Sequence, residues 1–177
     1  RLFRRQRQMC IRDSSRTSLS PSGKVVIEGR RITHSGNIYA NGAFGGKINV
    51  ISKDSIKLDG SILAKGITDT GGKVIIMSEN AIETTPKNVI DVSGQYKGGE
   101  IRTLAKKNIE ILGTLSSNSA QLGGQIDITA EKVKVEKAKI EAKGNYQGGK
   151  VRIGGDYLGG NITVSYTHLT LPTKQPV

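Results

Sequence analysis

Three features of the sequence predict that this chain is all-β and folds as a stack of similar coils. The first is a phrase with two leading glycines, whose copies are GGKINV at Gly45, GGKVII at Gly71, GGEIRT at Gly98, GGQIDI at Gly123 and GGKVRI at Gly148. The second is the spacing of these copies, 26, 27, 25 and 25 residues, because a fixed period indicates repeated structural units. The third is a composition of 23 glycines, no tryptophan and only two phenylalanines, which leaves short alternating runs of aliphatic residues to build the core.

Apolar residues recur at the same places in each repeat. Counted from the second glycine of a pair, they fall at +2 and +4, near +10 and +12, and near +16 and +18. In the first full repeat these positions hold Ile48, Val50, Ile56, Leu58, Ile62 and Ala64. This alternation predicts three short strands, each with two inward residues, and three corners. The sequence therefore predicts a parallel β-helix of roughly six coils, partial ones included, with about 25 residues per coil.

The corners are marked by glycines and by changes in spacing. Paired glycines suit either a bend that needs positive φ or a close approach of two backbone segments. A two-residue insertion surrounds Pro86, and Val133 comes one place early in its repeat, so we expect these corners to tolerate changes in length. Stacked coils about 4.8 Å apart would form a rod about 25–30 Å long with an open strand edge at each end.

The two ends of the chain differ from the repeats. Residues 1–20 have no strand or helix period and are rich in arginine and serine, which predicts disorder. RQRQMCIRDS near the start and VSYTHLTLPT at Val164–Thr173 both resemble translated sequencing-adaptor read-through. We therefore expect one repeat domain at residues 21–163, with residues 1–20 and 164–177 foreign to the natural gene.

The formal charge of +12 raises the question of nucleic-acid binding. Residues 1–15 contribute +4 of it, and charges in the repeats lie singly between apolar residues, as on a solvated outer face. Because no nucleic-acid motif or interleaved aromatic accompanies the lysines, we expect no specific nucleic-acid partner and only weak attraction to anionic glycans. No apolar run approaches the roughly 20 residues of a membrane-spanning helix, so we expect no membrane span.

Two rows of charged residues should stack on the outer face if the coils are in register. The first row consists of Lys57, Glu83, Glu110 and Lys134, each between the two inward residues of a second strand. We interpret it as a charge-balanced ladder, because Lys57 and Lys134 flank the two glutamates. The alternative is an acid–base pair at Glu83 and Glu110, which is disfavoured because no Arg or His lies in the row to bind or activate a substrate. The second row consists of Arg102, Asp127 and Arg152, whose alternating sign predicts a structural role.

One corner is a candidate sugar-stacking patch. It consists of Tyr96, Gln121 and Tyr146, which lie three residues before the second glycine of successive pairs. Packing within the turn is the competing interpretation. His34 and His168 have no second ligand at metal spacing, and GGDYLGG at Gly154 lacks the Gly-Lys-Ser/Thr ending of a phosphate loop. We therefore expect no metal and no cofactor.

Two phrases, IDVSGQYKGGEI at Ile90–Ile101 and IEAKGNYQGGKVRIGGDYLGG at Ile140–Gly160, resemble the repeats of filamentous-haemagglutinin-type exoproteins. The resemblance covers about residues 23–161 and implies a right-handed parallel β-helix. It also implies secretion from a Gram-negative bacterium by the two-partner route, through a dedicated outer-membrane transporter. Members act as adhesins or as stalks that carry toxins. The chain lacks the family's signal peptide and amino-terminal secretion domain, so we expect an interior piece of a longer shaft.

The expected function is therefore structural and non-enzymatic: a shaft segment of a secreted surface adhesin, with surface glycans as possible ligands. The first alternative is a polysaccharide lyase or hydrolase, because such enzymes also use parallel β-helices. Carboxylates gathered with Arg or Lys in a groove would favour the enzyme, and an evenly charged face would favour the shaft. A basic nucleic-acid binder is the second alternative, and it depends on the charge at the ends.

Overall fold

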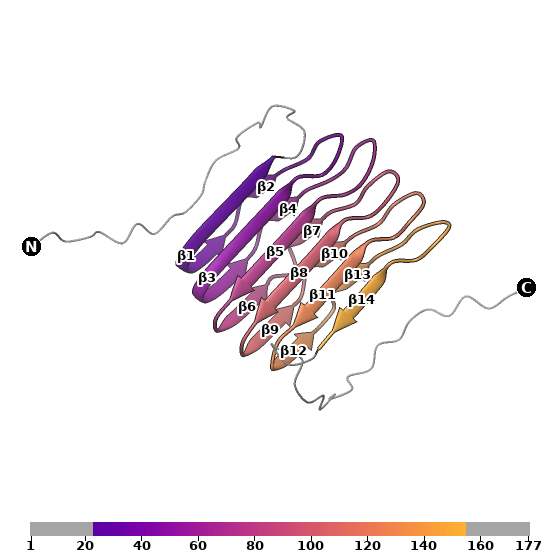
Figure 1. The fold of residues 1–177 in the computed structure, drawn as a ribbon. Helices are drawn as coiled ribbons and strands as arrows, with labels where there is room; N and C mark the ends of the chain where they lie inside the picture. Colours follow the sequence, from indigo (N-terminus) through magenta and orange to yellow (C-terminus); the bar gives the residue numbers. More distant parts are fainter. Residues whose placement is uncertain (1–22, 155–177) are drawn as a thin grey trace, which may run out of the picture.

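The computed structural model describes residues 23–154, which form one stack of coils without a helix (Figure 1). Strands succeed one another along the stack from β1 to β14, so position along the rod follows position in the sequence (Figure 1). The predicted all-β parallel β-helix is confirmed, with about five turns of about 25 residues each. The predictions for residues 1–20 and 164–177 lie outside the described residues.

Each coil contributes strands to two sheets. The first two coils begin with long strands, β1 (Lys24–His34) and β3 (Lys47–Leu58), followed by the short β2 (Asn37–Tyr39) and β4 (Ser61–Leu63). Later coils divide the long strand in two at its corner. These coils hold β5 (Lys73–Ser78), β6 (Ala81–Thr84) and β7 (Val89–Asp91); β8 (Glu100–Ala105), β9 (Asn108–Ile111) and β10 (Thr114–Ser116); and β11 (Gln125–Thr129), β12 (Lys132–Val135) and β13 (Lys139–Glu141). A further coil begins with β14 (Lys150–Ile153).

All strand pairs are parallel and join equivalent strands of neighbouring coils. One sheet runs β12-β9-β6-β3-β5-β8-β11-β14, with β1 also on β3, and the other runs β13-β10-β7-β4-β2. The first sheet has this order because the two halves of β3 pair separately with β5 and β6. The register places Val74 over Ile48 and Ile101 over Val74, so equivalent inward residues stack in columns.

The core consists of these columns. In the coils that begin at Gly45, Gly71 and Gly98, all six predicted inward positions are buried, with the polar Thr84, Thr103 and Ser117 among them. The structure adds a seventh column, which consists of Ser52, Ser78, Ala105 and Ala130. Its small residues line the first corner, where the hydroxyls of Ser52 and Ser78 donate to carbonyls of the preceding coil at 2.7 and 2.6 Å.

The corner between the second and third strands differs in length from coil to coil. Four residues, 85–88, separate β6 from β7, whereas two residues, 59–60, separate β3 from β4. The buried Asn88 fills the enlarged corner and donates from Nδ2 to the carbonyl of Gly60 at 2.7 Å. The predicted insertion around Pro86 is therefore absorbed without disturbing the stack.

Candidate functional site

The glycine pairs form two columns in which neighbouring backbones come very close. A Cβ atom on Gly71 would lie 1.8 Å from the carbonyl oxygen of Val92, and one on Gly72 would lie 2.2 Å from that of Gly46. Within residues 23–154, positive φ occurs only at Lys137 and Gly154, outside the pairs. Close backbone approach, and not positive φ, therefore accounts for the paired glycines.

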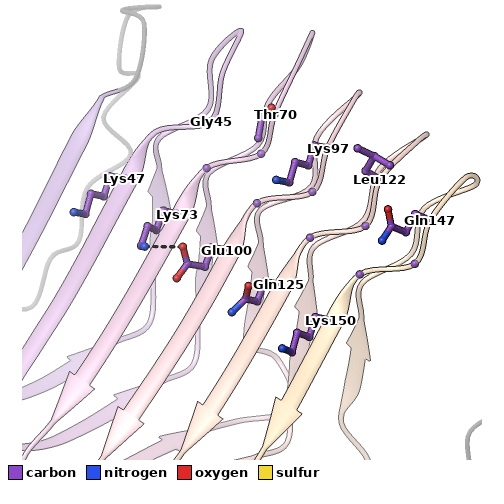
Figure 2. A pocket seen from close by; sticks show the side chains of 18 of the residues that line it. Gly45, Lys47, Thr70, Lys73, Lys97, Glu100, Leu122, Gln125, Gln147 and Lys150 are labelled. Atoms are coloured by element: carbon purple, nitrogen blue, oxygen red, sulfur yellow. Dashed lines mark hydrogen bonds and ion pairs between the residues drawn. The ribbon is translucent and has the colours of Figure 1, made fainter.

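These bare columns form the floor of a groove that runs along the rod, with a volume of about 750 Å³ (Figure 2). We call it the glycine groove. Its strand-side row consists of the residues that follow each pair: Lys47, Lys73, Glu100, Gln125 and Lys150. Its loop-side row consists of the residues that precede a pair: Thr70, Lys97, Leu122 and Gln147. The repeated Gly-Gly followed by a polar residue is the sequence signal of this groove, which was not predicted from the sequence.

Backbone hydrogen bonds give the floor an accepting character. The amide of Gly71 donates to the carbonyl of Lys97 at 2.8 Å, and the amide of Gly72 donates across its own loop to Ala64 at 2.7 Å. The pairs at Gly45, Gly98 and Gly123 repeat both bonds. The carbonyl of the first glycine in each pair accepts no hydrogen bond from another described residue. Because a trans peptide points this carbonyl opposite to the following amide, it faces away from the loop base, toward the outside.

Positive charge gathers along the strand-side row. Lys24, Lys47 and Lys73 stack in three consecutive coils, and like charges in such positions repel. Lys73 relieves part of this repulsion, because its Nζ lies 2.6 Å from Oε2 of Glu100 (Figure 2). Lys97 extends from the opposite row toward the strand side (Figure 2). Within residues 23–154, Lys47, Lys97 and Lys150 have no acidic partner in an ion pair.

The first charged row, which consists of Lys57, Glu83, Glu110 and Lys134, stacks in the order that the sequence predicts. Lys57 pairs in register with Glu83, Glu83 with Glu110, and Glu110 with Lys134. The flanking lysines bind the carboxylates, with Lys57 Nζ 3.2 Å from Glu83 Oε1 and Lys134 Nζ 2.8 Å from Glu110 Oε1. The bond to Glu110, with a further one to Glu136, raises the pKa of Lys134. Both carboxylates are thus already engaged in ion pairs with lysines.

The second row brings Asp127 between Arg102 and Arg152. Arg152 binds both carboxylate oxygens of Asp127, whereas Arg102 instead reaches Glu100, with Nη2 2.8 Å from Oε1. Hydrogen bonds from Arg152 hold the pKa of Asp127 below its ordinary value, against the opposing effect of burial. The contact of Arg152 with Asp127 therefore links β14 to β11, whereas Arg102 forms its ion pair within β8.

Tyr96, Gln121 and Tyr146, the candidate sugar-stacking patch, occupy equivalent places in successive coils. The amide of Leu122 donates to the carbonyl of Tyr96 at 3.1 Å, and the amide of Tyr146 donates to that of Gln121 at 3.0 Å. Both tyrosines are exposed, Tyr146 by 83% and Tyr96 by 50%. Since Gln121 lies between them, the two tyrosines are separated by a full coil.

His34 is an inward residue of the first coil, in the column above Leu58. Its Nε2 lies 3.4 Å from the carbonyl of Ser61, and burial lowers its pKa. Within residues 23–154 no three His, Cys, Asp or Glu side chains group where they would hold a metal ion. The same residues include no helix with the length and apolar character to cross a membrane. His168 lies outside the described residues.

Comparison with known proteins adds no relative: no family model, curated protein or solved structure matches this chain.

Proposed function

We propose that this chain is a structural, non-enzymatic segment of the shaft of a secreted bacterial surface adhesin of the filamentous-haemagglutinin type. The observation that carries the proposal is the uniform build of the rod. Every coil pairs with its neighbours through parallel strands, and the same inward columns continue from coil to coil. Such a repeat holds distance between its two ends, with stability supplied by nearest-neighbour contacts. Adhesion would then belong to the whole protein.

The charged rows support the shaft over a polysaccharide-active enzyme. A general acid or base must reach the proton that it transfers, with a pKa suited to that role. Glu83 and Glu110 lie side by side, but each forms an ion pair with a lysine of an adjacent coil. Charge balance between coils explains this row without a substrate.

The proposed location is the surface of a Gram-negative cell, reached through the outer-membrane transporter of a two-partner system. Its support is the resemblance of the phrases at Ile90–Ile101 and Ile140–Gly160 to exoprotein repeats. The repeats also contain no cysteine, since the single cysteine of the chain is Cys10. A repeat without thiols crosses an oxidising periplasm without forming incorrect disulfides.

Two experiments test this function. The chain, placed behind a two-partner secretion domain and coexpressed with its transporter, should carry a carboxy-terminal epitope tag to the cell surface. An epitope retained in the periplasm would contradict the proposed route.

The second experiment addresses the enzyme. The chain is incubated with neutral and acidic polysaccharides, and new reducing ends and unsaturated products are measured. We expect neither from the chain nor from its Glu83→Gln/Glu110→Gln variant. Product formed by the unmodified chain and lost in the variant would replace the shaft with an enzyme.

A further inference from the structure

We propose that the glycine groove binds an extended acidic polysaccharide that lies parallel to the rod axis. The site is independent of the shaft proposal, because it depends only on the groove floor and its two rows. The shape indicates a linear polymer. The groove spans the five glycine pairs from Gly45 to Gly149, and no side chain rises from its floor. Because the coils repeat about every 4.8 Å, successive units of an extended sugar chain would meet equivalent contacts.

The hydrogen-bonding character of the floor favours sugar hydroxyls. In the pairs at Gly45, Gly71, Gly98 and Gly123, both amides already donate within the protein, whereas the first carbonyl accepts nothing from the described residues. The floor therefore presents hydrogen-bond acceptors that have no donor. The hydroxyl groups on each ring of a polysaccharide can donate to them. An added peptide strand would need free amides as well as carbonyls, so it fits this floor less well.

The charge of the rows favours an acidic sugar over a neutral one. Lys47 and Lys73 are stacked with a third lysine at one end of the groove, which costs free energy that an anionic ligand would recover. Lys97 faces them from the loop side, and Lys150 lies at the other end. Carboxylates along a uronic-acid chain would form charge-assisted hydrogen bonds with these ammonium groups. No aromatic residue of the described part of the chain lines the groove, so its described walls lack the stacking platform that single-stranded nucleic acids use.

The test uses the full chain and oligogalacturonate, with affinity measured by isothermal titration calorimetry at low and physiological salt. The test variant is Lys47→Gln/Lys97→Gln, because neither lysine has an ion-pair partner within residues 23–154. The control variant is Lys53→Gln/Lys107→Gln, which removes the same charge from exposed lysines outside the groove. We expect the test variant to weaken binding by about tenfold and the control to change it less than twofold.

Three competing ligands make the result specific. A neutral oligogalactan has the hydroxyl groups without the charge, and polyglutamate has the charge without the hydroxyl groups. A single-stranded oligodeoxynucleotide tests whether the groove binds nucleic acid instead. Oligogalacturonate should bind about tenfold more tightly than each of them at physiological salt. No binding, equal affinity for all polyanions, tighter binding of the oligonucleotide, or equal loss in both lysine variants would overturn the proposal.

Discussion

Arg152 of β14 holds Asp127 of β11 in a two-point contact across one coil step. Arg152 Nε lies 2.6 Å from Asp127 Oδ1 and Nη2 lies 2.8 Å from Oδ2, while Nε2 of Gln125 donates to Oδ2 as well. The side chain of Asp127 is only 6% exposed, although its row faces outward. The last described strand, β14, is therefore held to β11 by the ion pair between Arg152 and the buried Asp127 carboxylate as well as by backbone hydrogen bonds.

Replacing Arg152 with alanine should lower the free energy of unfolding at neutral pH, because it leaves a covered carboxylate underpaired. Arg152→Lys keeps the charge but not the planar fork, so we expect an intermediate loss. Asp127 has a lowered pKa, so its contribution is present above about pH 4 and disappears as the pH falls through its folded-state pKa. Urea denaturation should show that the free energies of unfolding of the unmodified chain and of Arg152→Ala become equal in acid. Equal stability at neutral pH would contradict a structural role for the pair.

His34 should make the rod less stable in mildly acidic solution. Burial lowers its folded-state pKa below the ordinary value of 6.5, so the unfolded chain binds the proton first. Its contribution is complete above about pH 6.5 and is lost as the pH falls below that value. His34→Leu continues the column with the residue found at Leu58 and removes this dependence. Urea midpoints at about pH 7.5 and about pH 5 measure the difference, because the carboxylates with lowered pKa titrate below this window.

Two inward threonines with different surroundings form a matched pair. The hydroxyl of Thr103 is buried without a hydrogen bond to any described residue, whereas Oγ1 of Thr84 accepts from the amide of Leu112 at 2.9 Å. Thr103→Val should therefore raise the free energy of unfolding by about 1 kcal/mol, and Thr84→Val should lower it by about 1–2 kcal/mol. Thermal melts of both variants test this. Loss of stability in both would show that the hydroxyl of Thr103 has a partner after all.

The fold could be predicted because it repeats. An alternation that is weak in one strand becomes strong when it returns about every 25 residues, and the predicted columns at Ile48, Ile56 and Ile62 are all buried. The column of Ser52, Ser78, Ala105 and Ala130 escaped prediction because small and polar residues do not mark an inward position by hydrophobicity. Their burial follows from the tight first corner, which is a property of packing between coils.

The charged rows could be predicted because register alone places them. Once the coils align, Lys57 must lie beside Glu83, and Asp127 beside Arg152. The glycine groove could not be predicted in the same way. The groove exists because the glycines have no side chains. Its two walls come from different parts of each coil, the end of a loop and the start of the next strand.

The two glycines of a pair are required only where another coil covers them, and two substitutions separate these cases. Gly72→Ala would place Cβ 2.2 Å from the carbonyl oxygen of Gly46, whereas a Cβ on Gly148 meets no atom of residues 23–154 within 4 Å. Gly72→Ala should cost roughly 3 kcal/mol or more, because backbone must move, and Gly148→Ala should change stability by less than about 0.5 kcal/mol. Chemical denaturation compares the two. A marked loss in Gly148→Ala would show that a further coil stacks on this end.

Removing one whole coil should leave a shorter but intact rod. Deleting residues 99–123 joins Gly98 to Gly124, which restores a Gly-Gly pair and places β11 directly against β5 in the same register. The inward columns stay in register, with Ile126 above Val74 and Ile128 above Ile76, and Lys134 takes the place of Glu110 beside Glu83, so the charged row stays balanced. Because stability in such a stack is a sum over neighbouring coils, the variant should keep a strand-rich circular dichroism spectrum and a single, lower melting transition. Deleting only residues 99–110 removes β8 and all of β9 except Ile111, and it misaligns every later column, so this control should lose its cooperative melt. If both deletions melt alike, the contacts between successive coils do not determine the stability of the rod.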